Sequence, residues 1–437
     1  MSADPSRWPG RRLHFIGIGG AGMSGLAAVA HRLGAAVTGS DRSESSYVAR
    51  LRAAGIEPAI GHDAANLPDG AEVVVSTAIG EGNPELAVAR ERGLTVRHRS
   101  ELLAELCAER RTIAIAGTHG KTTTTGMVVH ALRRLGLDPA YFVGGELPAA
   151  EPGGEPANAG WGEGEWVVVE ADESDGSFLT LSPEIAVVTN VEMDHHARWS
   201  NLAELREAFE TFAGRARTAI LPAGDHGLAA LPGVETVPFA ADRPGPEGLR
   251  LAVPGAHNRL NARAALGALI AAGADGEEAA AALADFPGVR RRLEYKGEAA
   301  GTRVYDDYAH HPTEVRAALT ALRELAPERL IAVFQPHLYS RTKIFSQEFG
   351  AALALADELI VLDVYPAREE PVGPLAGVSG LDVLREAASR GGGRPVWWAP
   401  DLDAAERAAR TRLGPGRALV TLGAGDVTKL SDRLPDG

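Results

Sequence analysis

Ile113-Ala-Ile-Ala-Gly-Thr-His-Gly-Lys-Thr-Thr-Thr-Thr125 is the stretch of sequence that decides the fold. Residues 113–116 are small and apolar, which is typical of a buried strand. Gly117 and Gly120 then mark a tight loop, and residues 121–135 follow the pattern of a helix. The sequence therefore predicts a strand, a glycine loop and a helix in direct succession.

A loop of this kind is suited to polyphosphate. Backbone N–H groups and the positive end of the following helix attract phosphate oxygens, and Lys121 adds a mobile cation. Thr122 offers a hydroxyl to a magnesium ion that bridges the phosphates. The Gly-x-x-Gly-Lys-Thr-Thr spacing is shorter than the usual phosphate loop, which has glycine at the position of Ile115. An ordinary glycine turn before a surface helix is the alternative.

Composition limits the possible functions. At 437 residues the chain should form two or three domains, because single cores rarely exceed about 250–300 residues. No apolar run approaches the roughly 20 residues that span a bilayer, and Met1–Pro5 shows no secretory signal. The single cysteine, Cys107, is expected to be a buried structural thiol. We expect a cytoplasmic protein. Its net charge of −14 disfavours nucleic acids and anionic membranes as partners.

Alternating strands and helices predict an α/β fold of three domains, with parallel strands joined by right-handed crossovers. The expected domains are a Rossmann-like N-terminal domain (1–109), a P-loop-type ATPase domain with a mostly parallel sheet (110–289) and a Rossmann-like C-terminal domain (290–437). Strands are expected at 13–18, 36–39, 73–76, 113–116, 166–169, 185–188, 219–221, 303–306, 330–334, 358–362, 396–398 and 418–422. Helices are expected at 23–34, 44–54, 83–92, 121–135, 257–272 and 276–285, and an exposed loop over 147–165.

A second glycine motif lies near the N-terminus. Gly17-Ile-Gly-Gly-Ala-Gly22 follows the first strand, and Asp41 lies near the distance expected for a carboxylate that binds a ribose. A glycine turn at a helix N-terminus is suited to a diphosphate. The residues leave open whether that diphosphate belongs to NAD or to a nucleotide sugar.

Acidic side chains follow two strands of the predicted central domain. Glu170-Ala-Asp-Glu-Ser-Asp175 begins where the strand at 166–169 ends, and Asp194 and His195 follow the strand at 185–188. Parallel strands present their ligands at their carboxyl ends, and Mg²⁺ prefers oxygen ligands. A solvated acidic loop and a hydrogen-bonding loop histidine are the alternatives.

Three further segments carry polar side chains. Asn258 and Asn261 lie one helical turn apart, and their amides suit an adenine edge, although an N-capping asparagine would look the same. Segments 306–312 and 335–342 each follow a strand of the third domain, and Arg341 is suited to bidentate binding of a carboxylate or phosphate. The glycine loop at 423–426 is compatible with a plain turn.

Taken in order, these motifs resemble the Mur ligase family across nearly the whole chain. The resemblance rests on Gly-Thr-His-Gly-Lys-Thr-Thr at 117–123, Glu170, the Asn-x-Glu-x-Asp-His run at 190–195, His-Asn-x-x-Asn at 257–261, Arg-Arg-Leu-Glu at 291–294, and Asp-Tyr-Ala-His-His-Pro at 307–312. Segments 17–24, 306–314 and 335–342 most resemble the members that act on UDP-N-acetylmuramate and L-alanine, except that Leu338 replaces a commonly basic residue.

The resemblance implies an ATP- and Mg²⁺-dependent ligase of peptidoglycan precursor synthesis that joins L-alanine to the lactyl carboxyl of UDP-N-acetylmuramate through an acyl phosphate. It implies catalytic roles for Lys121, His310 and Arg341, and metal ligation by Thr122, Glu170 and His195. The implied ATP-binding residues are Gly117, Thr118, His119, Gly120, Lys121, Thr122, Thr123, Asn258, Asn261, Arg292 and Asp307. The implied residues for the other substrates are Gly19, Gly20, Gly22, Met23, Ser24, Asp41, Ser76, His337 and Arg341.

Other functions remain as alternatives at this stage. An NAD-dependent oxidoreductase would use the Gly17–Gly22 turn and Asp41, but it leaves Gly-Lys-Thr-Thr unexplained. A related ligase would attach a recycled tripeptide to UDP-N-acetylmuramate. A nucleotide-sensing scaffold would bind ATP without turnover that depends on an amino acid. The oligomeric state is open between monomer and homodimer.

Overall fold

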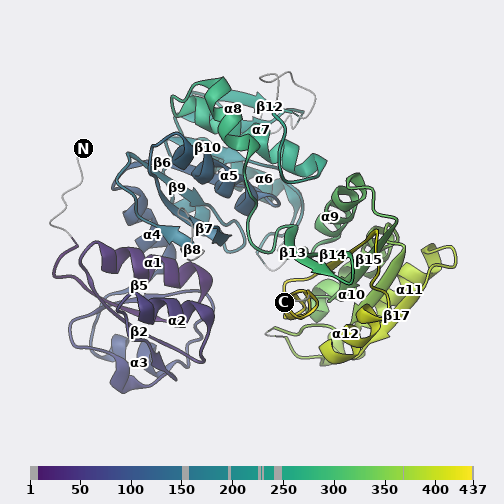
Figure 1. The fold of residues 1–437 in the computed structure, drawn as a ribbon. Helices are drawn as coiled ribbons and strands as arrows, with labels where there is room; N and C mark the ends of the chain where they lie inside the picture. Colours follow the sequence, from purple (N-terminus) through teal and green to yellow (C-terminus); the bar gives the residue numbers. More distant parts are fainter. Residues whose placement is uncertain are drawn as a thin grey trace. The chain divides into compact units, whose positions relative to one another are not determined.

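Three β-sheets with helices packed on their faces make up the protein in the computed structural model (Figure 1). The structure describes residues 8–149, 157–194, 198–224, 228, 231–240, 249–367 and 369–435. Nearly all strand pairs are parallel, which confirms the predicted α/β class with mostly parallel sheets. The predicted domain boundaries stay a prediction.

The first sheet has the strand order β3-β2-β1-β4-β5, and all its pairs are parallel. Its strands are β1 (Arg12–Ile16), β2 (Ala36–Asp41), β3 (Ala59–Ile60), β4 (Glu72–Val75) and β5 (Val96–His98). The accompanying helices are α1 (Ala21–Arg32), α2 (Ser46–Ala53), α3 (Pro84–Glu91) and α4 (Arg99–Cys107). The order reverses between β1 and β4, where doubly wound sheets bind ligands. The glycine turn follows β1, and Ser76 follows β4.

The second sheet has the order β12-β11-β10-β6-β9-β7-β8, with only β7 and β8 antiparallel. Its strands are β6 (Arg111–Ala116), β7 (Ala140–Leu147), β8 (Ala157–Gly160), β9 (Trp166–Glu170), β10 (Ile185–Val188), β11 (Thr218–Pro222) and β12 (Glu235–Phe239). Its helices are α5 (Lys121–Arg134), α6 (Leu202–Ala213), α7 (Ala256–Ala271) and α8 (Gly276–Ala284). Strands β9, β6 and β10 are neighbours, so their carboxyl ends share one edge.

The third sheet has the order β13-β14-β18-β15-β16-β17, with β13 antiparallel to β14. Its strands are β13 (Glu294–Ala299), β14 (Thr302–Asp307), β15 (Arg329–Phe334), β16 (Glu358–Leu362), β17 (Val396–Ala399) and β18 (Arg417–Leu422). Its helices are α9 (Pro312–Glu324), α10 (Tyr339–Leu353), α11 (Gly380–Arg390), α12 (Leu402–Arg410) and α13 (Thr428–Arg433).

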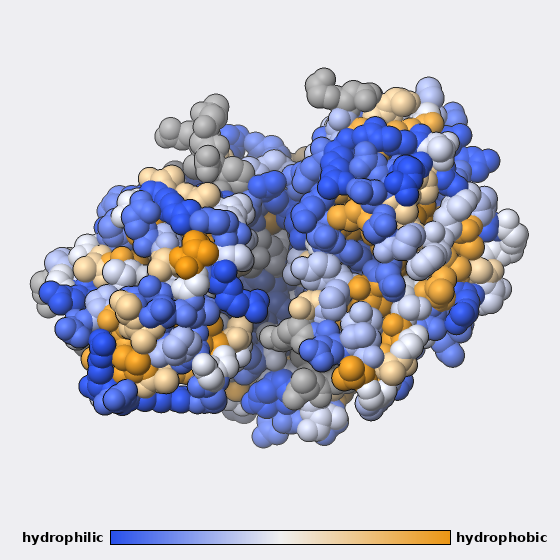
Figure 2. Space-filling model, turned by 90° about the horizontal axis from the view of Figure 1, so that it is seen from below, coloured by the Kyte–Doolittle hydropathy of each residue, from blue (hydrophilic) through white to orange (hydrophobic). Residues whose placement is uncertain are grey.

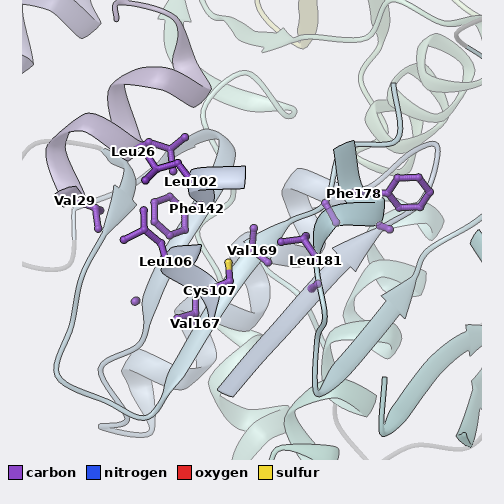
Figure 3. Packing of buried hydrophobic residues seen from close by; sticks show 14 of the residues in the cluster. Leu26, Val29, Leu102, Leu106, Cys107, Phe142, Val167, Val169, Phe178 and Leu181 are labelled. Atoms are coloured by element: carbon purple, nitrogen blue, oxygen red, sulfur yellow. The ribbon is translucent and has the colours of Figure 1, made fainter. Parts of the chain in front are cut away.

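The chain divides into two compact units. One comprises residues 1–250 and 260–286, and the other comprises residues 251–259 and 287–437. In the first unit, one apolar core joins the first two sheets. Leu26 of α1 and Leu102 of α4 are buried in the same cluster as Phe142 of β7 (Figure 3). Cys107 is also buried in this cluster, which confirms the predicted structural thiol.

The loop expected at 147–165 is wrong in part. Residues 157–160 form β8, which pairs with β7, and Trp161 is buried. Residues 150–156 lie outside the described part. The Ala-Asn-Ala-Gly sequence of β8 has little strand propensity, so tertiary contacts determine its structure. Asn158 donates to the carbonyl of Ala21, and an added Cβ on Gly25 would lie 2.8 Å from Ala159. Strands β3, β5, β7, β12 and β13 were not predicted either.

A buried carboxylate organises the first sheet. Glu85 of α3 is fully buried and accepts hydrogen bonds from His14 Nε2 (3.1 Å), Ser40 Oγ (2.6 Å) and Asn66 Nδ2 (2.9 Å). Burial raises its pKa, but these hydrogen bonds outweigh burial and lower the pKa to about 2. The Ser40 carbonyl in turn accepts from the N–H groups of Gly17 and Ile18. Glu85 therefore supports the glycine turn.

We expect Glu85→Gln to lower the free energy of unfolding at pH 7 by about 3 kcal/mol, because a carboxylate with a depressed pKa stabilises the folded state above its unfolded pKa. That contribution is lost as the pH falls from near 4.5 toward about 2. Thermal unfolding midpoints of wild type and variant should therefore converge as the pH is lowered from 6 to 3.5. A constant difference over this range would contradict the prediction.

On the face in Figure 2, hydrophobic residues are scattered among hydrophilic ones. Among the residues that the structure describes, none of the helices combines the length and apolar character that a membrane span requires.

Candidate active site

The loop between β6 and α5 is clamped by the segment that follows β10. Asn190 accepts from the N–H of His119 (2.9 Å) through its side-chain oxygen and donates its amide to the His119 carbonyl (2.8 Å). Thr118 Oγ1 donates to the Glu192 carbonyl (2.9 Å). Gly117 has φ +131°, and an added Cβ would lie 2.0 Å from Thr189 Oγ1. Only glycine fits there, so the loop conformation is fixed by its neighbours.

Gly120 caps α5 in a left-handed conformation and lies against Asn261 of α7. Its φ is +82°, and an added Cβ would lie 2.4 Å from Asn261 Oδ1. Asn261 is buried, and the close approach to Gly120 places its amide against the loop before α5. Asn258 precedes it by one turn of α7, and its Nδ2 donates to the Pro254 carbonyl (2.7 Å).

We expect Gly120→Ala to raise the KM for ATP about tenfold or more, because the methyl group would push the loop away from Asn261. The matched control is Gly136→Ala in the same domain. Gly136 has a similar φ of +74°, but nothing lies within 4 Å of its added Cβ. Backbone strain is thus common to both variants, and the clash is confined to Gly120. Equal KM values for the two variants would contradict the prediction.

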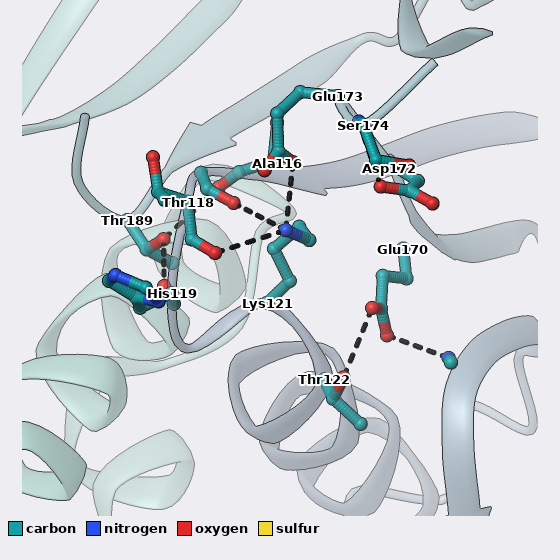
Figure 4. Close-up of polar contacts among 12 residues, drawn as sticks. Ala116, Thr118, His119, Lys121, Thr122, Glu170, Asp172, Glu173, Ser174 and Thr189 are labelled. Carbon is teal, nitrogen blue, oxygen red and sulfur yellow. Dashed lines mark hydrogen bonds and ion pairs between the residues drawn. The ribbon is translucent and has the colours of Figure 1, made fainter. Parts of the chain in front are cut away.

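Lys121 is held at the centre of the site (Figure 4). Its Nζ donates to the carbonyls of Gly117 (2.7 Å) and Thr118 (3.2 Å) and pairs with Glu173 Oε2 (2.7 Å). Burial would lower the pKa of Lys121, but the nearby carboxylates, chiefly Glu173, raise it above its usual value. Burial raises the pKa of Glu173 to about 7, and Lys121 opposes that shift. Lys121 therefore remains a cation, aimed at the loop that would hold phosphates.

Thr122 and Glu170 meet beside this lysine. Thr122 Oγ1 donates to Glu170 Oε1 (3.0 Å), and Glu170 Oε2 accepts from the N–H of Gly144 (2.7 Å) (Figure 4). A hydroxyl from the first turn of α5 and a carboxylate from the end of β9 fit a hard cation such as Mg²⁺, which takes oxygen ligands. The third expected ligand, His195, lies outside the described residues.

In the first sheet, Asp41 holds the glycine turn. Its Oδ2 accepts from the N–H of Gly19 (2.9 Å), so the carboxylate lies at the turn, and ribose binding by Asp41 stays a prediction. Gly20 and Gly22 are exposed, whereas the side chains of Met23 and Ser24 are buried. The N–H groups of Met23 and Ser24 donate to the Gly20 carbonyl (3.0 and 2.8 Å), and substrate binding by these two residues stays a prediction. Ser76 is half-buried after β4.

In the third sheet, Asp307 is buried and turned toward the backbone. It accepts from the N–H groups of Leu293 (2.8 Å) and Ala309 (2.7 Å), and burial raises its pKa to about 7. Arg292 lies 5.3 Å from the Tyr308 ring and 3.9 Å from Glu314. Asp307 thus fixes the turns that carry Arg292 and Tyr308.

His310 and His337 come together from β14 and β15, with ring centroids 6.1 Å apart. Burial lowers the pKa of His310 to about 4, so its imidazole is neutral at pH 7. Its Nδ1 lies 3.0 Å from the Tyr308 carbonyl, so Nδ1 carries the proton and Nε2 is the acceptor. Arg341 is half-buried in the first turn of α10.

The sequence interpretation missed several residues of these sites. Glu173 was seen only as part of an acidic run, although it pairs with Lys121, and Asn190 was seen only as part of a family motif. Tyr365 was not singled out, yet its ring stacks on His337. Glu173 had a signal in its place after β9, whereas Tyr365 follows β16 without any motif.

Three mostly parallel α/β sheets, with a lysine, a hydroxyl and carboxylates gathered at one glycine loop, are typical of proteins that bind nucleotides. Family models agree along the chain. Residues 12–111 match the Mur ligase family catalytic domain, residues 115–240 the Mur ligase middle domain, and residues 291–425 the Mur ligase glutamate ligase domain. The chain belongs to the Mur ligase family.

Individual relatives agree with this assignment. UDP-N-acetylmuramate–L-alanine ligases from Kineococcus radiotolerans and Streptomyces coelicolor are each 46% identical to this chain; the alignments cover 97% of it and 95% and 97% of those proteins. The crystal structure of UDP-N-acetylmuramate–alanine ligase from Thermotoga maritima is 30% identical, with a TM-score of 0.82 over 97% of this chain and 98% of that one. A murein peptide ligase from Psychrobacter arcticus is 26% identical, with a TM-score of 0.69 and coverage of 97% and 98%.

Proposed function

We propose that this protein joins L-alanine to the lactyl carboxyl of UDP-N-acetylmuramate and converts ATP to ADP and phosphate. The observation that carries the proposal is the phosphate loop, where the Lys121 cation and the Thr122–Glu170 pair converge. The substrates are those named for the two UDP-N-acetylmuramate–L-alanine ligases that are 46% identical to this chain over nearly its whole length. ATP and a nucleotide-linked sugar are cytoplasmic metabolites, so we place the reaction in the cytoplasm.

The first step activates the carboxyl group. A carboxylate oxygen attacks the γ-phosphorus of ATP in line, the bond to the β–γ bridging oxygen breaks, and an acyl phosphate and ADP form. Lys121 would neutralise charge on the transferred phosphoryl group. Thr122 and Glu170, with His195, would hold Mg²⁺, which screens the repulsion between the anions. The 117–120 loop would orient the phosphates through its backbone N–H groups.

The second step forms the amide. The neutral amine of L-alanine attacks the acyl carbon, a tetrahedral intermediate forms, and phosphate leaves with the electrons of the C–O bond. The lowered pKa of His310 keeps its imidazole neutral at pH 7, so Nε2 would accept a proton from the amine. His337 and Arg341 would bind the amino acid, the guanidinium taking its carboxylate. Arg292 and Asp307 would organise the nucleotide-facing side of the same sheet edge.

The division of labour follows the proposed domains. Residues 1–109 would bind the UDP moiety at Gly19, Gly20, Gly22, Asp41 and Ser76, residues 110–289 would bind ATP, and residues 290–437 would bind L-alanine. The glycine turn lies where the first sheet reverses its strand order, which supports a diphosphate there. An NAD-dependent reaction is not favoured, because the phosphate loop has no role in it.

A second candidate keeps the chemistry and changes the amine. The likeness to a murein peptide ligase (TM-score 0.69) supports a ligase that attaches a peptide instead of a single amino acid. The higher TM-score of 0.82 and the higher identity with the alanine ligase favour L-alanine.

The test is an ADP-release assay with ATP, Mg²⁺ and UDP-N-acetylmuramate. We expect release to depend on L-alanine and the UDP-linked product to gain the mass of one alanyl residue. A tripeptide supplied in place of L-alanine should give little turnover. Efficient turnover with the tripeptide alone would favour the second candidate, and ADP release with neither amine would contradict both.

A further inference from the structure

Four aromatic rings form a row at the carboxyl edge of the third sheet. Tyr308 contacts His310 edge-on at 5.3 Å, His310 contacts His337 at 6.1 Å, and Tyr365 stacks on His337 with centroids 5.8 Å apart and planes 13° apart. The first three rings follow β14 and β15, and His310 and His337 belong to the proposed amino-acid site. Tyr365 comes from the segment after β16 and has no role in the proposed reaction.

The backbone of Tyr365 is tied to the segment that carries His337. The N–H of Tyr365 donates to the Pro336 carbonyl (2.8 Å), and the N–H of Leu338 donates to the Tyr365 carbonyl (3.0 Å). These two bonds form a parallel bridge between His337 and Tyr365. The ring stack is therefore held in a fixed register.

This bridge supports a strained turn. Leu338 has φ +70°, a conformation that costs a residue with a side chain about 1–2 kcal/mol. Such a conformation persists only where neighbours hold it. Glu369, from the same segment as Tyr365, accepts from the N–H of Ser340 (2.9 Å) at the start of α10. The strained turn lies between His337 and Arg341, and Tyr365 and Glu369 hold the backbone on either side of it.

A glycine packs closely against the Tyr365 ring. A Cβ added to Gly425 would lie 2.6 Å from the Cγ of Tyr365 and 2.3 Å from Gln335 Oε1. No left-handed backbone calls for glycine at this position, so close packing explains it. The 423–426 loop, which looked like a plain turn in the sequence, therefore forms the wall against which Tyr365 is pressed.

We infer that Tyr365 is a positioning residue, which holds His337 in the orientation that binds the incoming amino acid. Its ring stacks on His337 and packs closely against Gly425, and its backbone fixes the turn at Leu338. This inference rests on the proposed function, because it assumes that His337 contacts L-alanine. It adds a residue that acts through His337 and does not itself react.

The first experiment compares Tyr365→Phe, Tyr365→Ala and Tyr295→Ala in the full chain. Phe keeps the stacked ring, and Tyr295 is an exposed tyrosine of the same sheet (54% exposed). We expect Tyr365→Ala to lower kcat/KM for L-alanine about 10- to 100-fold, since a misplaced binding group costs rate in this range. In Tyr365→Ala, the KM for ATP should stay within about twofold of wild type. Tyr365→Phe and Tyr295→Ala should keep kcat/KM for L-alanine within about twofold of wild type. An equal loss of kcat/KM for L-alanine in Tyr365→Phe and Tyr365→Ala would overturn the inference. An equal rise of the KM for ATP and the KM for L-alanine in Tyr365→Ala would also overturn it.

A double-mutant cycle with His337→Ala tests whether Tyr365 acts through His337. If it does, removing the Tyr365 ring from the His337→Ala variant costs nothing further, and the two losses are not additive. Additive losses, or full activity of His337→Ala, would overturn the inference. Failure of the proposed function is separate, because the wild-type protein would then show no ADP release that depends on L-alanine.

Discussion

Lys121→Ala is expected to lower the rate of L-alanine-dependent ADP release by about three orders of magnitude or more, because catalysis of phosphoryl transfer consists of positioning and charge neutralisation. The lysine is the cation whose Nζ contacts two carbonyls of the phosphate loop, and the carboxylates around it keep it charged. The effect should fall mainly on kcat, since transferred charge develops in the transition state.

Two further variants separate lost chemistry from lost structure. Removing Lys121 takes away the cation that pairs with the buried Glu173, which raises the pKa of that carboxyl further and destabilises its charged form. Lys121→Ala combined with Glu173→Gln removes this penalty, so it should unfold at nearly the wild-type temperature and remain inactive. Lys121→Arg keeps the charge but not the compact ammonium geometry, and we expect partial activity. Near-normal ADP release by Lys121→Ala would refute the phosphate-loop assignment.

Much of the arrangement of the central site could be predicted from the sequence, because its residues lie close together along the chain. Gly117, Gly120 and Lys121 lie within a few residues of each other, and strand, loop and helix follow from their order alone. Glu170 could be placed because it follows an apolar strand directly. The parallel order of β9, β6 and β10 then brings these groups to one edge.

The features that could not be predicted depend on contacts between segments that are far apart in the sequence. Lys121 and Glu173 are 52 residues apart, and nothing in the acidic run distinguishes Glu173 from Asp172 as the partner of the lysine. Tyr365 reaches His337 only because β15 and β16 are neighbours. Similarly, β8 exists because β7 and α1 flank it, although its own residues favour a loop. Such features need the three-dimensional arrangement, which local propensity does not encode.

Glu170→Gln is expected to raise the Mg²⁺ concentration for half-maximal rate at least about tenfold and to lower kcat by about 100-fold, because metal sites lose both affinity and charge screening when a carboxylate ligand is neutralised. Glutamine has nearly the same shape, but its amide supplies one acceptor oxygen where the carboxylate now serves both Thr122 and Gly144. The variant thus keeps the packing and loses the anionic charge. The measurement is a Mg²⁺ titration of ADP release at saturating ATP.

Glu165→Gln is the matched control for that titration. Glu165 directly precedes β9, its side chain is 60% exposed, and it pairs with Arg111. The Glu165→Gln variant therefore removes one charge from the same domain, but away from the phosphate loop. An exposed ion pair of this kind contributes little to stability. The Mg²⁺ titration curve of Glu165→Gln should therefore overlay that of wild type. If both variants gave the wild-type curve, Glu170 would not be a ligand, and Thr122 would need a different partner for the metal. If both shifted equally, general electrostatics would explain the effect. Only a shift confined to Glu170 supports a metal between the ends of β6 and β9.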